Sequence, residues 1–222
     1  MGKWIELTAA DGVTVKGYRA DPAGKPRGGL VVVQEIFGVN AHIREVCDGY
    51  AADGYLAVAP GIFDRVERGV DMGYTPDDMK RGIDIRARCK VDQVLADIAA
   101  ARAVAAAAGR VGVIGYCWGG YLAYLSAARL PGFSCAIAYY GGGMQDALAE
   151  KPKVPVLGHF GEQDKHIPVE GIRKLAAAHP ALAAHFYDAD HGFNCNHRGA
   201  FDAAAATLAR ERTLAFLREH VG

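Results

Sequence analysis

The stretch VGVIGYCWGG, residues 111–120, joins a short apolar run to a glycine-rich turn that contains one cysteine. The run over residues 111–114 predicts a buried strand, and residues 118–129 predict a helix. Cys117 lies at the turn between them, in the pattern G-x-C-x-G. A sharp strand-to-helix turn strains the central residue, and glycines on either side avoid steric clashes. The stretch therefore predicts an α/β unit that holds a thiol at a helix N-terminus, where the helix dipole favours a thiolate.

Strand-like and helical patterns alternate along the chain around this stretch. Strands are predicted over residues 4–7, 13–18, 29–33, 55–58, 111–114, 135–139, 154–159 and 185–187. Helices are predicted after Asn40 up to Asp53-Gly54, over 77–107 with a break near Gly82, and over 118–129, 169–178 and 200–220. The polar residues 64–76 predict a surface loop. This order is typical of a single α/β domain over residues 1–222, with a mostly parallel central sheet, an antiparallel N-terminal edge and helices on both faces.

The composition argues against several classes of protein. The 25 basic and 25 acidic residues give a formal net charge of zero, so we expect no broad basic surface for nucleic acid or an anionic membrane. The N-terminus lacks the apolar segment of a secretory signal, and no apolar run approaches membrane-spanning length. The five cysteines are odd in number and widely spaced, which favours free thiols in a reducing cytoplasm.

Two further residues follow later strands in the order that a nucleophile, an acid and a histidine take on such a sheet. Asp164 comes after the strand at 154–159, and His191 comes after the strand at 185–187. Histidine can accept the thiol proton, and a carboxylate can fix its tautomer. The coincidence of all three favours a catalytic triad over the alternative that Cys117 is a structural thiol. Other acids and histidines in the same loops are Glu162, Asp188, Asp190, His166 and His197, in a poorer register against the strand ends.

Backbone amides near two strand ends could stabilise an oxyanion. Trp118 begins the predicted helix after the cysteine, so its amide can point at the substrate oxygen. The loop after residues 29–33 should supply the second amide, from Ile36. Glu35 lies in the same loop, where a buried carboxylate is unfavourable unless it is paired. An ordinary loop carboxylate, or one held by an arginine, is the alternative role for Glu35.

The chain resembles the dienelactone hydrolase family, a branch of the α/β-hydrolases, over almost its whole length. The matching pieces are Gln34-Glu35-Ile36-Phe37-Gly38, Gly115-Tyr116-Cys117-Trp118-Gly119-Gly120, Tyr139-Tyr140-Gly141, Asp164 with Pro168, Asp190-His191-Gly192-Phe193 and Arg212-Thr213-Leu214-Ala215-Phe216. The resemblance implies the α/β-hydrolase fold, a small ester or lactone substrate and no cofactor. It also implies that Cys117 is the nucleophile, His191 the base and Asp164 its orienting acid. Glu35 would help to generate the thiolate when substrate binds.

The substrate contacts depart from the family pattern. In the founding enzymes two arginines hold a substrate carboxylate, one of them four positions after the catalytic histidine, where this chain has Cys195. Arg198 is a candidate substitute, and Arg81, next to Lys80, is a candidate for the second arginine. Tyr140 and Phe193 could line the pocket.

Three functional alternatives remain open from the sequence. The favoured one is a hydrolase that forms an acyl-thioester and cleaves a lactone or ester. The second is a general carboxylesterase or thioesterase with the same residues, and the third is a non-catalytic thiol-sensing or binding protein. No metal is expected, because the cluster of Asp190, His191, Cys195 and His197 lacks a recognised ligand spacing.

Overall fold

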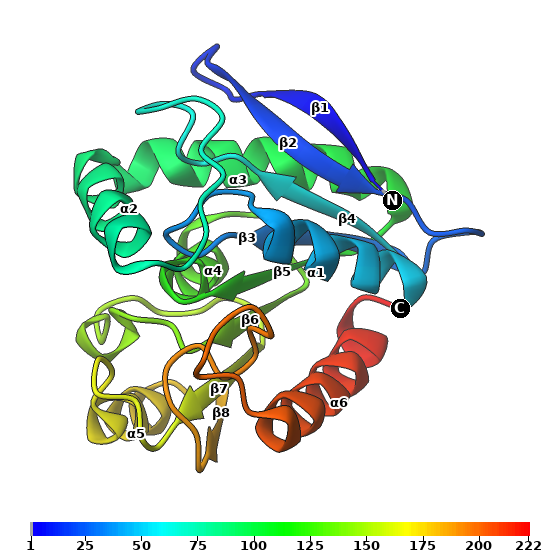
Figure 1. Ribbon diagram of the computed structural model, residues 1–222. Helices are drawn as coiled ribbons and strands as arrows, with labels where there is room; N and C mark the ends of the chain where they lie inside the picture. Colours follow the sequence, from blue (N-terminus) through cyan, green and yellow to red (C-terminus); the bar gives the residue numbers. More distant parts are fainter. Residues whose placement is uncertain (1) are drawn as a thin grey trace. The chain divides into compact units, whose positions relative to one another are not determined.

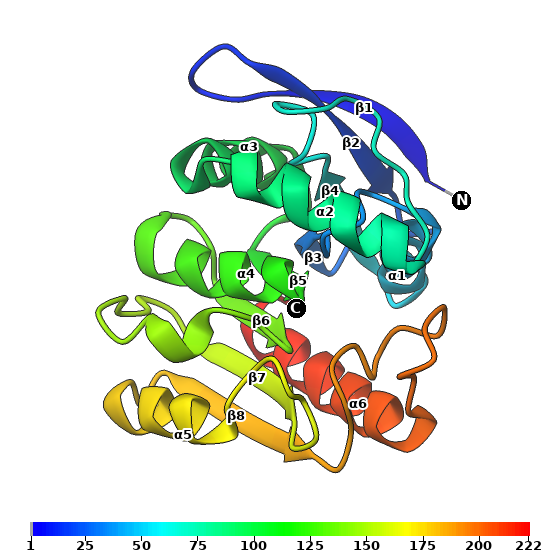
Figure 2. The same cartoon turned by 60° about the vertical axis from the view of Figure 1, so that its left-hand side comes forward.

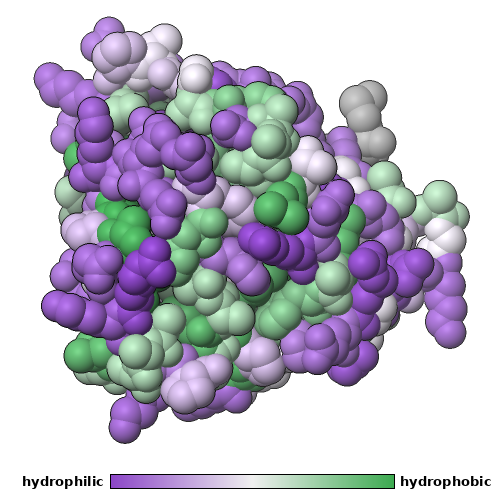
Figure 3. Space-filling view, turned by 90° about the horizontal axis from the view of Figure 1, so that it is seen from below, coloured by the Kyte–Doolittle hydropathy of each residue, from purple (hydrophilic) through white to green (hydrophobic). Residues whose placement is uncertain are grey.

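The computed structural model describes residues 2–222 and divides them into two compact units, one up to Val111 and one from Gly112 to Gly222 (Figure 1). A single domain over the whole chain stays a prediction. Polar residues dominate the face drawn in Figure 3, with apolar residues in smaller groups between them. No helix among residues 2–222 has the length and apolar character needed to cross a bilayer.

The first unit is built on four strands with the spatial order β1-β2-β4-β3. They are β1 (Lys3–Thr8), β2 (Thr14–Ala20), β3 (Gly28–Val33) and β4 (Tyr55–Pro60). The pairs β1–β2 and β2–β4 are antiparallel and β3–β4 is parallel, which confirms the predicted antiparallel N-terminal edge. Every residue of β3 and β4 is buried, as expected for the continuous apolar runs that form them.

Helices cover both faces of β3 and β4. Helix α1 (Ala41–Ala52) begins at the predicted N-cap Asn40, whose side chain accepts a hydrogen bond from the Ile43 amide at 3.2 Å. Helix α3 (Val91–Ala105) contacts the same two strands and lies on the opposite side of them from α1 (Figures 1 and 2). Helix α2 (Pro76–Arg88) precedes α3 and starts with a capping box at Thr75.

The predicted helix over 77–107 is two helices, and its break is not at Gly82. The chain leaves the helical conformation at Cys89 and Lys90, whose backbones are extended. Gly82 lies inside α2, where a Cβ would come within 2.1 Å of the Ile36 carbonyl oxygen. The glycine is therefore required by a close contact with the loop after β3, and it does not end the helix.

The polar residues between β4 and α2 are anchored in the unit, so the prediction of a plain surface loop is wrong in part. Val70 and Met72 are buried. Arg65 donates to the buried carboxylate of Asp97 on α3 at 2.8 Å and to the more exposed Asp11 at 2.6 Å. The polar composition of this stretch does not reveal such anchoring, because Arg65 forms its ion pairs with residues distant in sequence.

The second unit has four parallel strands in the order β5-β6-β7-β8. They are β5 (Val111–Tyr116), β6 (Cys135–Tyr139), β7 (Val156–Gly161) and β8 (Leu182–Tyr187), and β8 is longer than predicted. Helices α4 (Trp118–Arg129) and α5 (Val169–Ala178) have the predicted bounds, and α6 covers Ala203–His220. A short 3₁₀ helix, η2 (Met144–Asp146), follows β6. Helix α6 packs on β6 and β7, on the face opposite α4 and α5 (Figures 1 and 2).

The cysteines differ in burial. Cys47, Cys135 and Cys195 are buried, whereas Cys89 and Cys117 are partly exposed, and within residues 2–222 none of the five forms a disulfide. Free thiols were expected from their number and spacing. Burial raises the pKa of Cys47, and it raises the pKa of the Cys89 thiol to about 11.

Candidate active site

Cys117 occupies a strained turn between β5 and α4. Its φ of 55° and ψ of −120° lie outside the regions that non-glycine residues normally adopt. A Cβ on Gly115 would come within 1.9 Å of the Gly119 carbonyl oxygen, and one on Gly120 within 2.7 Å of the Tyr139 carbonyl oxygen. The glycines therefore permit the tight turn, which presents Cys117 directly before the first residue of α4.

Asp164 and His191 are in hydrogen-bond contact. Their atoms Oδ2 and Nδ1 are 2.6 Å apart, and the Asp164 side chain is only 1% exposed. The other carboxylate oxygen, Oδ1, accepts hydrogen bonds from the amides of His166 and Ile167 at 2.8 and 3.2 Å. The loop after β7 thus fixes the carboxylate, and the carboxylate fixes the orientation of the imidazole.

Cys117 is the second side chain that acts on His191. Because Asp164 occupies Nδ1, Nε2 is the nitrogen that remains for the thiol. Burial lowers the pKa of His191, but the hydrogen bonds with Asp164 and Cys117 together raise it more, to about 10. The site therefore favours a proton on this imidazole beside the sulfur.

The other acids of these loops have different partners. Glu162 accepts from Arg173 at 3.2 Å, and Asp188 accepts from the Gln163 side chain at 2.5 Å. Asp190 accepts from the backbone amide of His191 at 2.6 Å, which is not a contact with its ring. Among the histidines, exposed His166 lies with its ring centroid 5.5 Å from that of His191, and His197 is exposed.

Two buried aromatic residues support the histidine. The ring of Tyr140 is 5.1 Å from the His191 ring and 5.4 Å from the Phe193 ring. Tyr140 has a φ of 38°, so the backbone is strained at the end of β6 as well. Both side chains are fully buried, and the Tyr140 ring is the one that lies close to the histidine.

Of the two candidate arginines, one lies against Gly192, the residue after the histidine. The Arg198 guanidinium covers Gly192, where a Cβ would be 2.6 Å from Nη1. Arg81 lies in the first unit, on the exposed side of α2, and its guanidinium pairs with Glu67.

Glu35 and Ile36 are in the loop after β3 of the first unit. The Glu35 side chain is buried and accepts a hydrogen bond from the Tyr74 hydroxyl at 3.1 Å. Asn40, the cap of α1, donates to the same hydroxyl at 3.2 Å. Glu35 is therefore a buried carboxylate with a tyrosine hydroxyl as a hydrogen-bond donor. Sequence reasoning missed Tyr74, because it lies in a polar stretch without any periodic signal.

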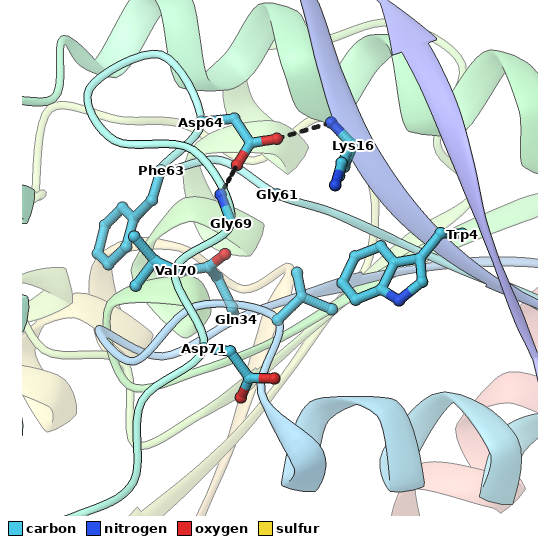
Figure 4. A pocket seen from close by; sticks show the side chains of 10 residues that line it. Trp4, Lys16, Gln34, Gly61, Phe63, Asp64, Gly69, Val70 and Asp71 are labelled. Atoms are coloured by element: carbon cyan, nitrogen blue, oxygen red, sulfur yellow. Dashed lines mark hydrogen bonds between the residues drawn. The ribbon is translucent and has the colours of Figure 1, made fainter.

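A separate pocket of about 200 Å³ lies in the first unit (Figure 4). Its walls include Trp4, Lys16, Gln34, Val39, Phe63, Val70 and Asp71, and none of the predicted site residues. Asp64 braces one side by accepting from the amides of Lys16 at 2.8 Å and Gly69 at 3.0 Å. The candidate site is thus not part of this pocket.

Comparison with known proteins identifies similar sequences. The chain matches the dienelactone hydrolase family over residues 15–221. A carboxymethylenebutenolidase of Pseudomonas putida is 35% identical over 96% of this chain and 94% of its own length. A protein of Azospirillum brasilense, provisionally assigned the same activity, is 37% identical over 98% of this chain and 99% of its own.

Solved structures are similar to this protein over nearly the whole chain. A Klebsiella pneumoniae protein, provisionally assigned as a dienelactone hydrolase, has a TM-score of 0.84 and 30% identity, covering 97% of this chain and 98% of that one. An esterase of Pyrococcus furiosus has a TM-score of 0.72 at 17% identity, covering 100% of this chain and 93% of its own, and shares the fold. The α/β-hydrolase fold predicted from the resemblance is confirmed.

Proposed function

We propose, since this chain belongs to the dienelactone hydrolase family, that it hydrolyses a small carboxylic ester or lactone with Cys117 as the nucleophile. In this proposal His191 is the general base and Asp164 orients it. The proposed steps use only side chains and water, so they need no cofactor. We also propose that the protein is cytoplasmic.

The proposed reaction has two acyl-transfer steps. The proton of the Cys117 thiol first moves to Nε2 of His191, the resulting thiolate bonds to the carbonyl carbon, and the imidazolium then gives that proton to the departing alkoxide. The products are an acyl-thioester and an alcohol, which stays tethered to the acyl group when the substrate is a lactone. Water then attacks the thioester, and its proton passes through His191 to the leaving sulfur. Because thiolates leave readily, esters and lactones suit this site better than amides.

The proposal adds two backbone amides and one carboxylate. Trp118 is the first residue of α4, so its amide points out of the helix N-terminus, which supports a role as an oxyanion donor. The second donor, the amide of Ile36, and the assisting carboxylate, Glu35, are assigned through the family motif Gln34–Gly38. The burial of Glu35 supports a specific role for its carboxylate.

The observation that carries the proposal is the arrangement around His191. One imidazole nitrogen is 2.6 Å from Asp164, and the pKa of the same ring is raised by Asp164 and by Cys117, which is held at a strained turn. A structural thiol needs neither the oriented imidazole nor the strain. Attack of a cysteine on an ester requires both a base that takes the thiol proton and a sulfur that the substrate can reach.

The test is hydrolysis of p-nitrophenyl acetate by wild type, Cys117→Ala and the control Cys89→Ala, which alters the other partly exposed cysteine. We expect Cys117→Ala to lose at least about 10³-fold in kcat, as nucleophile removal does in hydrolytic triads. Cys89→Ala should keep the wild-type rate. Mass spectrometry of the quenched reaction should find one acetyl group on wild type and none on Cys117→Ala. A wild-type rate in Cys117→Ala would refute the mechanism.

The position of Arg198 supports a substrate that carries an anionic group. A guanidinium against Gly192, one residue after His191, can hold a carboxylate by charge-assisted hydrogen bonds. We expect Arg198→Ala to raise KM for carboxylate-bearing lactones but to leave KM for p-nitrophenyl acetate unchanged. Arg81→Ala, which removes a surface ion pair with Glu67, tests the second candidate arginine in the same assay. Equal effects of Arg198→Ala on charged and uncharged substrates would contradict this assignment.

A further inference from the structure

A buried chain of polar side chains runs beneath the ends of β6, β7 and β8. Arg212 Nη1 donates to Tyr187 Oη at 3.0 Å, and Tyr187 Oη is 2.7 Å from His159 Nδ1. His159 Nε2 is 3.0 Å from Thr213 Oγ1, which is 2.8 Å from Tyr139 Oη. His159 and Thr213 are fully buried, and Tyr139 and Tyr187 nearly so. Buried polar groups on this scale are unfavourable unless every member is satisfied.

The direction of these hydrogen bonds is fixed by their donors. A guanidinium can only donate, so Tyr187 Oη accepts from Arg212. Among residues 2–222 the remaining polar partner of this hydroxyl is His159, so its proton points at Nδ1. A neutral imidazole that accepts at Nδ1 carries its proton on Nε2 and donates to Thr213. Thr213, whose polar partners are His159 and Tyr139, then donates to Tyr139.

The charge state of His159 agrees with this arrangement. Burial, with smaller contributions from His185 and Arg212, lowers the pKa of His159 well below its usual range, so the imidazole is neutral. The titratable groups that face it are His185 on β8, whose own pKa is lowered by burial, and Arg212 on α6. The side chains therefore form one directed series from Arg212 to Tyr139.

The backbones of two residues of this series, Tyr139 and Tyr187, hold the loops of the candidate site. The Tyr139 carbonyl accepts from the Cys117 amide at 3.0 Å. The Tyr187 carbonyl accepts from the amides of Glu162 and Ala189 at 2.7 and 2.8 Å. These two residues each lie two positions before a member of the Asp164–His191 pair. The side-chain series thus ties together the backbone positions from which all three candidate catalytic residues depart.

We propose that Thr213 and His159 are positioning residues, which hold Cys117, Asp164 and His191 in register through the directed series from Arg212 to Tyr139. The inference rests on the proposed function. Neither residue touches substrate. Thr213 is hydrogen-bonded to Tyr139, which holds the turn at Cys117. His159 is hydrogen-bonded to Tyr187, which holds the loops of Asp164 and His191. An apolar core would fill the same space but would not fix the relative position of these strand ends.

The test compares Thr213→Val, which removes the hydroxyl at nearly constant shape, with Thr213→Ser, which keeps it. Both are assayed on p-nitrophenyl acetate at a temperature where circular dichroism finds them fully folded. We expect Thr213→Val to lower kcat about tenfold with KM within about twofold of wild type, the size of effect typical of coupling through packed networks. Thr213→Ser should restore kcat. Equal kcat in wild type and Thr213→Val would overturn the inference.

A second measurement is independent of activity. Nitrogen-15 NMR of the wild-type protein should find His159 in the tautomer protonated at Nε2, and Arg212→Met should populate both tautomers, because Tyr187 is then free to reverse its proton. His159 protonated at Nδ1 in wild type would overturn the directed series. Activity that survives in Cys117→Ala would overturn the proposed function and this inference together. A Cys117-dependent activity that Thr213→Val leaves unchanged would overturn this inference alone.

Discussion

Replacing Gly115 by alanine should disable the turn at Cys117. The added Cβ would lie 1.9 Å from the Gly119 carbonyl oxygen and 2.2 Å from its carbonyl carbon, and ordinary van der Waals contact begins at 3.4 Å. The first turn of α4 must therefore shift by about 1.5 Å relative to β5. Both atoms belong to the backbone, so no side-chain rotation can relieve the contact.

This displacement sets the expected magnitudes. Overpacking a rigid site costs about 1–3 kcal/mol, and we expect Gly115→Ala at the upper end of that range. A loss of about 3 kcal/mol lowers Tm by roughly 6–12 °C in a protein of this size. A misplacement of about 1 Å at a reacting group can reduce the rate about 100-fold, so kcat should fall at least that far.

The assay combines thermal unfolding, followed by circular dichroism, with p-nitrophenyl acetate hydrolysis. Gly24→Ala is the control, because a Cβ there meets nothing within 4 Å. It should leave kcat unchanged and alter stability by less than about 1 kcal/mol. If Gly115→Ala matches Gly24→Ala in both Tm and kcat, the steric reasoning about the turn is wrong.

Three further predictions test other parts of the molecule. Asp97→Ala leaves a buried guanidinium without its main partner and should cost about 3–5 kcal/mol in urea unfolding, far more than Asp11→Ala, whose carboxylate is more exposed. Gly82→Ala should destabilise α2 and reduce ester hydrolysis, because the added Cβ would lie 2.1 Å from the carbonyl oxygen of Ile36, the proposed oxyanion residue. This steric effect should exceed the better helix propensity of alanine. Unchanged kcat and Tm would count against the prediction. The pKa of His191 is raised to about 10, so its stabilising charge is complete below pH ~6.5 and is lost as pH rises through about 10. Asp164→Asn should weaken that decline in unfolding free energy, and an identical pH profile would contradict the assigned contact.

Periodicity predicted the second unit well because its elements are short and strongly patterned. Helices α4 and α5 have the bounds that the sequence indicates, since glycine or proline punctuates their starts and apolar residues recur at helical spacing. The break between α2 and α3 was misplaced at Gly82. That glycine serves a contact between segments, and a local pattern carries no information about such contacts.

The candidate site was predictable where chain order is informative. Asp164 and His191 each follow a strand, and parallel strands bring such loops to one edge of a sheet, so their contact could be expected. The contact of Tyr74 with Glu35 and the series from Arg212 to Tyr139 could not be expected from the sequence. Their members are distant in sequence, and a buried threonine or histidine has the same pattern as any core residue. Only the side-chain geometry reveals which polar groups meet.

The unequal burial of the cysteines has a practical consequence for chemical labelling. Cys47, Cys135 and Cys195 are shielded from any reagent in the folded protein, and the pKa of Cys89 is raised to about 11, which leaves it almost entirely protonated near neutral pH. Alkylation therefore falls on Cys117 without removal of the other thiols by mutation. A fluorescent or affinity-tagged haloacetamide can thus count molecules with a reactive Cys117 in a purified preparation of the native chain.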